Sequence, residues 1–325
     1  MLYFTNYSRL RKYLLSRRSV EAIRRRKKKI MQTIDLKVLL EAGAHFGHKT
    51  NKWHPSAAKF IYKAVGDIHI IDLVKTKENL ESARDFIFQQ VSQGKEVLFV
   101  GTKRQAGAVI KQEAEAVNAP YISSRWIGGF ITNWQEVKKN IEKMNQIEKD
   151  LKDASKMSKY TKLERVLMDR ERGKLESVYG GVRKMEKNPD ILFVIDVRKE
   201  ETAILEARNN HLKVVGVVDT NTNCTKVDYA IPANDDAVGS ISYITKVITE
   251  AYQEGKQTFE KNQVKAKELE LKQKAAQEKK MQEAKEKEVA EKERAMQEAT
   301  EKIIAERKEA EKKSAKEQAD KSKTV

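Results

Sequence analysis

The segment from residue 39 to residue 53 combines side chains that could bind a metal ion or a polyanion. His45 and His48 stand three residues apart and are followed by Lys49, Lys52 and Trp53. Imidazole nitrogens at this spacing can share a metal ion if other elements supply the remaining ligands. Ammonium groups beside an aromatic ring suit the phosphates and unstacked bases of RNA. The segment therefore predicts a binding surface.

Two carboxylates could complete a metal site or form an acid–base pair. Asp196 and Asp219 each end an apolar run, and the carboxyl ends of parallel strands share one crevice. A metal would draw on His45, His48, Asp196 and Asp219, although imidazoles bonded to loop carbonyls are the simpler arrangement. No nucleophile with a paired base accompanies the carboxylates. We assign no catalytic residue and no metal ligand, and the metal question stays open for these four side chains.

A basic loop follows the apolar run at 97–100. From Gly101 to Gly107 it carries neither the Lys-Ser/Thr ending of a P-loop nor the GxGxxG dinucleotide turn. It does place Lys103 and Arg104 at the start of an expected helix, where backbone amides can hold a phosphate without reading bases. The loop therefore predicts a contact to a nucleic-acid backbone.

Residues 123–134 form another unusual segment, with paired glycines between aromatic and cationic side chains. The glycines permit close approach of the backbone. We expect Trp126 and Trp134 to pack at the base of a helical insertion. Arg125 is then available for stacking on bases.

The distribution of charge limits how a polyanion could be bound. The chain has 325 residues and a formal net charge of +17. Residues 1–30 carry 11 Lys and Arg against one Glu, and residues 256–325 carry 20 against 16 acidic residues, so residues 31–255 have a net charge of only +3. A central domain so close to neutrality must bind nucleic acid through local patches.

Composition also bears on compartment. Cys224 is the single cysteine, so an internal disulfide or a cysteine-based metal cluster is excluded, as expected in a reducing environment. No apolar run approaches the roughly 20 residues that span a bilayer, and we expect no membrane partner. Residues 1–30 have three interpretations: a basic arm, a start-site artefact with the true start at Met31, or an organellar transit peptide.

From about residue 97 onward, apolar runs alternate with amphipathic segments, as in the βα units of a parallel sheet. Runs of β-branched and aromatic residues without polar alternation suit strands that are covered on both faces. The sequence therefore predicts an α/β domain with an open, doubly wound parallel sheet. Buried strands are expected at 68–73, 96–101, 191–196 and 214–219, edge strands at 120–122 and 229–231, and helices at 76–93, 105–117, 200–210 and 238–254.

Residues 133–178 interrupt this alternation with two stretches of helical periodicity separated by a turn-prone interval. They predict an antiparallel helical hairpin inserted into the α/β domain, with a basic outer face that could track phosphates. The apolar positions are Val137, Ile141, Met144, Ile147 and Leu151 in the first stretch, and Leu163, Val166, Leu167, Leu175 and Val178 in the second.

The tail at 256–325 alternates Lys, Glu, Ala and Gln and contains no Pro or Gly. Glu–Lys pairs four residues apart favour a long charged helix, and each contributes about 0.2–0.5 kcal/mol. Its apolar stripe is thin, so we expect a fraying helix or disorder in isolation.

Eight segments, in this order, resemble the bacterial-type small-subunit ribosomal protein S-two family, and together they cover about residues 31–255. They are LLEAGAHFGHKTNKWHP (39–55), IHIIDLVKT (68–76), VLFVGTKRQA (97–106), RWIGGFITNW (125–134), GGVRKM (180–185), PDILFVIDVRKE (189–200), VVDTN (217–221) and VDYAIPANDDA (227–237).

The resemblance implies a flavodoxin-like, three-layer α/β/α domain with an inserted coiled-coil hairpin. It implies a structural constituent of the small ribosomal subunit, without catalysis or cofactor, that binds small-subunit ribosomal RNA and supports docking of the mRNA-binding protein S-one. The expected location is the cytoplasm, in the bacterial small subunit, with an organellar ribosome as the alternative. The arm at 1–30 and the tail at 256–325 lie outside the resemblance and inherit no role from it.

Carried over by motif, the expected RNA contacts come from four places: the first segment, the basic loop, the glycine-containing segment and the hairpin. They are Lys49, Lys52, Trp53, His54, Lys59, Lys103, Arg104, Gln105, Arg125, Asn133, Lys138 and Lys139.

Two other functions compete with the ribosomal one. The first is a nucleotide- or metal-dependent enzyme on a flavodoxin-like fold, which the missing phosphate-loop lysine and the missing nucleophile oppose. The second is a tether built around the helical tail, for which a whole α/β domain with basic loops would be superfluous.

Overall fold

The computed structural model describes residues 34–158, residues 160–265 and seven single positions beyond them. The chain divides into two compact units, Met1–Phe259 and Glu260–Val325. The expected arm at 1–30 and most of the expected tail lie outside the described residues. In the second unit, every described position is helical.

A five-stranded parallel sheet with the order β5-β4-β6-β7-β8 forms the centre of the first unit. Its strands confirm the five expected at 96–101, 120–122, 191–196, 214–219 and 229–231. Their bounds are β4 (Val97–Val100), β5 (Tyr121–Ile122), β6 (Ile191–Ile195), β7 (Lys213–Val218) and β8 (Tyr229–Pro232).

Alternate residues of these strands face two separate hydrophobic cores, as the period of two in a strand requires. Val97 and Phe99 belong to one core, whereas Leu98 and Val100 belong to the other. Because both faces are covered, the strands need no polar alternation. The doubly wound α/β arrangement expected from the sequence is confirmed, and it agrees with a flavodoxin-like fold.

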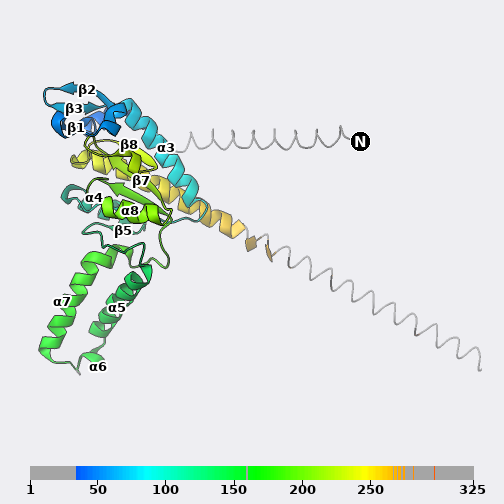
Figure 1. Cartoon of the computed structure of the whole chain (residues 1–325). Coiled ribbons are helices and arrows are strands. Elements are labelled where there is room, and N and C mark those ends of the chain that lie inside the picture. Colours follow the sequence, from blue (N-terminus) through cyan, green and yellow to red (C-terminus); the bar gives the residue numbers. More distant parts are fainter. Residues whose placement is uncertain are drawn as a thin grey trace, which may run out of the picture. The chain divides into compact units, whose positions relative to one another are not determined.

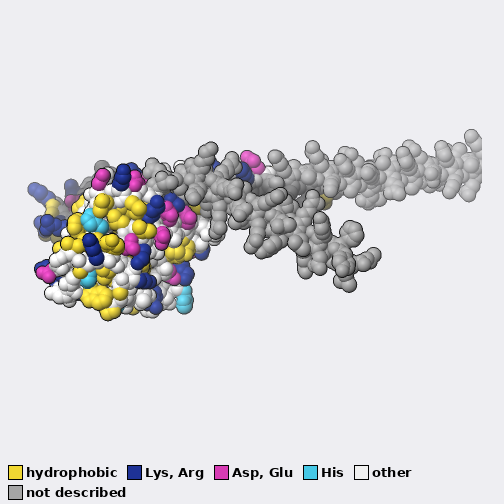
Figure 2. Space-filling view, turned by 90° about the horizontal axis from the view of Figure 1, so that it is seen from above, with side chains coloured by type: hydrophobic (Ala, Val, Ile, Leu, Met, Phe, Trp, Pro, Cys, Tyr) yellow, Lys and Arg dark blue, Asp and Glu magenta, His cyan; other side chains and the backbone are white. Residues whose placement is uncertain are grey.

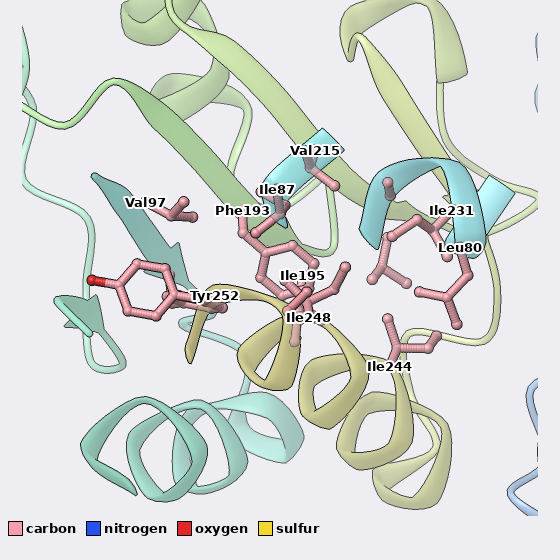
Figure 3. Packing of buried hydrophobic residues seen from close by; sticks show 14 of the residues in the cluster. Leu80, Ile87, Val97, Phe193, Ile195, Val215, Ile231, Ile244, Ile248 and Tyr252 are labelled. Carbon is pink, nitrogen blue, oxygen red and sulfur yellow. The ribbon is translucent and has the colours of Figure 1, made fainter. Parts of the chain in front are cut away.

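The first core lies under α2 (Leu36–Glu41), α3 (Leu73–Val91), α4 (Arg104–Ala116) and a helix that begins at residue 238. Figure 3 shows Ile248 of this last helix directed at Phe193 and Ile195 of β6, and Ile244 belongs to the same core. Helix α3 starts earlier than expected because the Asp72 carboxylate accepts a hydrogen bond from the Val74 amide and caps it.

The second core lies under α8 (Glu201–Asn209), the segment at 126–131 and the base of α5 (Trp134–Lys152). Trp126 and Phe130 pack here with their ring centroids 5.1 Å apart, and Trp134 packs against Phe130 at 5.7 Å. The expectation that both tryptophans pack at the base of the insertion is confirmed. Among the helices of the described residues, none combines the length and apolar character needed to cross a membrane.

One buried carboxylate holds the glycine-containing segment in place. Glu206 of α8 accepts hydrogen bonds from Trp126 Nε1 at 3.1 Å and from the backbone amides of Gly129, Ile131 and Thr132 at 2.8, 3.1 and 3.5 Å. Four donors converge on one side chain that is 8% exposed. Glu206 therefore fixes the point from which α5 departs.

A second sheet is small and antiparallel, with the order β1-β3-β2, and Figure 1 places it at the top of the molecule. Its strands are β1 (Phe46–Lys49), β2 (Ile61–Val65) and β3 (Ile68–Ile71). The expectation of a buried parallel strand at 68–73 is therefore wrong. In β3 only Ile71 is buried, because no helix of the described residues covers the outer face of this sheet. Gly66 (φ 58°) makes the two-residue turn between β2 and β3.

The inserted hairpin comprises α5, the short α6 (Ala154–Met157) and α7 (Lys162–Tyr179), and its two long helices lie side by side in Figure 1. Val137, Ile141, Met144 and Ile147 of α5 are buried as expected. Leu163, Val166 and Leu167 of α7 are instead 68%, 42% and 51% exposed, so the expected apolar stripe is not packed there. The facing end of α5 is mostly charged, and its only apolar side chain is Leu151.

Replacing Glu206 by Gln should destabilise the protein by about 2 kcal/mol, because an amide offers fewer acceptor sites and leaves buried N–H groups unpaired. Urea denaturation measures this change. Glu201→Gln on the same helix is the control: its carboxylate is 53% exposed and pairs with Lys226, so a loss below about 1 kcal/mol is expected. Equal losses for the two variants would contradict the structural role of Glu206.

Candidate nucleic-acid interface

An ion cluster occupies the carboxyl-terminal edge of the parallel sheet. Lys103 follows β4, and its Nζ lies 3.3 Å from Asp196, 2.8 Å from Asp235 and 2.6 Å from Asp236. Asp196 follows β6 in a left-handed conformation with φ 67°, and the other two carboxylates follow β8. The Lys103 side chain is only 15% exposed. These contacts tie three strand ends together, and the expected phosphate contact of Lys103 stays a prediction.

The antiparallel sheet joins this cluster through His48 on β1. His48 Nδ1 lies 3.0 Å from Asp219 Oδ2, and His48 Nε2 lies 3.6 Å from Asp236. The His48 amide also donates to Thr220 Oγ1 at 2.9 Å. Thr220 approaches Gly47 so closely that a Cβ there would lie 2.7 Å from Thr220 Cγ2. Only glycine fits at that point, and β1 is thereby seated against the loop after β7.

Of the four side chains considered for a metal site, the structure brings together two. Ligand atoms of His48, Asp219 and Asp235 lie within 4.8 Å of one another and could hold a cation. Asp196 instead contacts Lys103, and His45 packs against Phe46 with ring centroids 4.0 Å apart. The sequence analysis missed Asp235, although its place after an edge strand matches that of Asp196 and Asp219.

The charged groups of this cluster lie so close together that they shift one another's pKa values. Burial and the charges of Asp196 and Asp219 raise the pKa of Asp235 to about 7, against the opposing effect of Lys103. The hydrogen bond to Asp219 raises the pKa of His48, although burial acts in the other direction. Burial lowers the pKa of Lys103, but hydrogen bonds to Asp235 and Asp236 outweigh it and leave the pKa raised.

Cations of a different kind surround the antiparallel sheet. Lys49, Lys52, Lys59 and Lys63 are exposed, and within the described ranges none of them has a carboxylate at ion-pair distance. Lys59 Nζ lies 4.8 Å from the centre of the Phe60 ring. These lysines keep their charge available to an external anion.

Aromatic and aliphatic side chains are exposed among these lysines. Trp53 is 42% exposed, Tyr62 68%, Val65 54% and Ile68 40%. Figure 2 shows hydrophobic side chains mixed with Lys and Arg over the face seen from above, where Figure 1 places the antiparallel sheet. The sequence analysis identified Trp53 and missed Tyr62. His54, by contrast, is half-buried, and its Nδ1 lies 2.8 Å from Ser56 Oγ.

The remaining expected contacts lie on other elements. Arg104 and Gln105 are exposed on the first turn of α4, and Arg125 and Asn133 are exposed on either side of the glycine-containing segment. On α5, Lys138 is exposed without an ion-pair partner among the described residues, whereas Lys139 Nζ lies 2.6 Å from Glu136. The expected contacts thus form separate patches along the antiparallel sheet, the edge of the parallel sheet and the base of the hairpin.

Lys103→Gln should cost about 3 kcal/mol at pH 8, because it leaves buried carboxylates without a counter-charge. The loss should shrink at pH 5, where Asp235, with a pKa of about 7, is protonated. Urea denaturation at both pH values measures it. Arg104→Gln is the matched control: Arg104 is exposed, so a change within about 0.5 kcal/mol is expected. A pH-independent loss for Lys103→Gln would contradict this account.

A raised pKa for His48 means that its pair with Asp219 stabilises the fold fully below the unfolded value of 6.5 and that this contribution is lost as the pH rises through the folded pKa. The stability difference between wild type and His48→Gln should therefore be largest below pH 6.5 and decline above it. Denaturation between pH 5.5 and 8.5 measures it, with His45→Gln as the control. The same slope for both histidine variants would contradict the assignment.

Comparison with known proteins agrees with this arrangement. The family model for ribosomal protein S2 matches residues 39–255. The small ribosomal subunit protein uS2 of Helicobacter hepaticus is 45% identical over 223 residues, covering 69% of this chain and 84% of that protein. The uS2 proteins of Coprothermobacter proteolyticus and Helicobacter pylori are 46% and 41% identical, covering 70% and 72% of this chain and 84% and 89% of their own length. The chain belongs to the ribosomal protein S2 family.

Proposed function

We propose that this chain holds its place in the small ribosomal subunit by binding small-subunit ribosomal RNA, and that it supports docking of the mRNA-binding protein S-one. Its relatives are named as small-subunit proteins, and the family is one of structural proteins. Family membership therefore decides against the nucleotide- or metal-dependent enzyme. It equally disfavours a free-standing tether.

One observation supports the RNA-binding proposal: some lysines are paired with carboxylates of the protein, whereas others are not. The Lys103 ammonium has three carboxylates within 3.3 Å. Lys49, Lys52, Lys59 and Lys63 have none within ion-pair distance in the described part of the chain, and they lie on β1, on β2 and in the segment that joins these two strands. Cations held apart from internal carboxylates are the groups that displace counterions from a phosphate backbone.

The exposed aromatics support the same partner. Trp53 and Tyr62 lie among these lysines, and single-stranded or looped RNA is commonly bound by stacking its bases on aromatic rings. Arg104, Arg125 and Lys138 extend the cationic surface towards the hairpin. Phosphate contacts at several separate patches would fix the orientation of the domain without reading sequence.

Docking of S-one is supported by the apolar part of the antiparallel sheet. Val65 and Ile68, which are paired across β2 and β3, expose large side chains. Exposed apolar groups rimmed by charge are typical of protein interfaces. A protein partner held there would be positioned by a rigid sheet whose β1 strand is tied to the parallel sheet through His48.

The RNA-binding proposal predicts that single charge reversals at Lys52 and at Arg104 each weaken binding to small-subunit ribosomal RNA about ten-fold at moderate salt. Each should also reduce the slope of log affinity against log salt by about 1, because one phosphate contact is lost. Filter binding between 50 and 200 mM salt measures both quantities for the full chain.

Lys246→Glu provides the control, because Lys246 is exposed on the helix that begins at residue 238 and lies outside the proposed patches. It makes the same change of charge and should leave the slope unaltered. If Lys246→Glu weakened binding as much as Lys52→Glu, net charge rather than the proposed patches would govern the interaction.

A further inference from the structure

A hollow of about 330 Å³ opens at the base of the hairpin, at the amino-terminal edge of the parallel sheet. It lies between Glu96, which precedes β4, the turn that leads into β5, and the short helix η3 (Gly180–Val182) after α7. Pockets for small molecules begin at about 300 Å³. The ion cluster lies at the other end of β4, so this hollow is a separate site.

Flat, apolar walls line part of the hollow. Ala119, Pro120 and Met185 are buried there, and the ring of Tyr121 is partly exposed. The backbone of Gly181 lies directly against Tyr121, since a Cβ on Gly181 would approach the Tyr121 carbonyl oxygen to 2.3 Å. The ring is thus held rigidly on one side. A planar group entering the hollow would meet an immobilised aromatic.

Two carboxylates, Glu96 and Glu115, also line the hollow. Glu96 is half-buried, and among the described residues no hydrogen-bond donor or ion-pair partner contacts its carboxylate. Burial raises the pKa of this carboxyl. Glu115 already accepts the Tyr121 hydroxyl at 2.5 Å. Glu96 is therefore a lining carboxylate that can accept hydrogen bonds from a ligand with adjacent N–H groups.

The basic side chains of Arg183 and Lys184 complete the lining. Within the described ranges, Lys184 Nζ donates to the neutral Asn118 Oδ1 at 3.0 Å and has no carboxylate at ion-pair distance. Arg183 donates through Nε to Asn145 Oδ1 at 2.5 Å and pairs with Glu148. A second hollow of about 340 Å³ shares Arg183 and is also lined by Lys149 and Lys152. Basic side chains thus lead from the first hollow along the hairpin, which is a path suited to a phosphate backbone.

We propose that the hollow binds one unstacked guanine of the RNA that this protein contacts. Guanine carries two adjacent donors, N1–H and N2–H₂, which can both donate to the Glu96 carboxylate. Its acceptors, O6 and N7, can accept hydrogen bonds from the basic side chains of Arg183 and Lys184. Adenine has no such pair of donors and cytosine and uracil have smaller rings for the Tyr121 wall. The inference rests on the proposed RNA-binding function and adds a base-specific contact to it.

Ultraviolet crosslinking of the full chain to small-subunit ribosomal RNA tests this proposal, with adducts identified by mass spectrometry. The tryptic peptide at 112–125, which contains Tyr121, should carry guanosine in preference to other nucleosides. Glu96→Gln should lower that adduct about ten-fold, because an amide pairs with only one of the two N–H groups. Glu186→Gln is the matched control: it is exposed on the neighbouring turn and does not line the hollow.

The outcomes separate this site from the proposed function. Two results would overturn the guanine site alone while RNA binding persists. One is the absence of guanosine from the Tyr121 peptide. The other is an equal amount of adduct in Glu96→Gln and in the wild type when both proteins have the same urea midpoint. Loss of all RNA binding in the wild type would overturn both proposals. Adding guanosine monophosphate as a competitor, with adenosine monophosphate as the comparison, tells whether the hollow binds guanine of RNA or a free nucleotide. Binding of free guanosine monophosphate without any RNA adduct would refute the RNA assignment.

Discussion

The contact of Lys103 with three carboxylates is the interaction on which the geometry of the molecule depends. It joins the loops after β4, β6 and β8, and His48 links the antiparallel sheet to the same group through Asp219 and Asp236. Parallel strands bring their carboxyl ends to one edge, so acidic residues at those ends repel one another unless a cation lies between them. The ammonium of Lys103 meets this requirement from within the chain.

This constraint divides the cations of the domain into two groups. Those near buried carboxylates stabilise the fold, and those on the antiparallel sheet and at Arg104 are available to a partner. The central domain is close to neutral overall, so its affinity for a polyanion depends on which side chains remain unpaired rather than on their number. Neighbouring residues can belong to different groups, as Lys103 and Arg104 do.

The base of the hairpin is also held in place by specific contacts. Glu206 accepts four N–H groups from the segment that precedes α5, and Gly181 lets the end of the hairpin pack directly on Tyr121. Together they fix the hairpin to the α/β domain at both of its ends. The exposed apolar residues of α7 lie beyond these anchors, where α5 offers them few apolar partners.

The sequence by itself determined those helices and strands that follow from the pattern of residues close together along the chain. Continuous apolar runs such as 191–195 specify strands covered on both faces, and helical periodicity specifies the hairpin, because both patterns reflect local backbone geometry. The motifs from 39 to 237 were sufficient to indicate the family. The antiparallel sheet escaped prediction because β1 and β2 are short and carry histidine, lysine and glycine. Only the tertiary structure decided that Lys103 pairs with Asp235, 132 residues away, while Arg104 stays exposed. Ion pairing depends on the distance between two groups in space, and their separation along the chain does not give that distance.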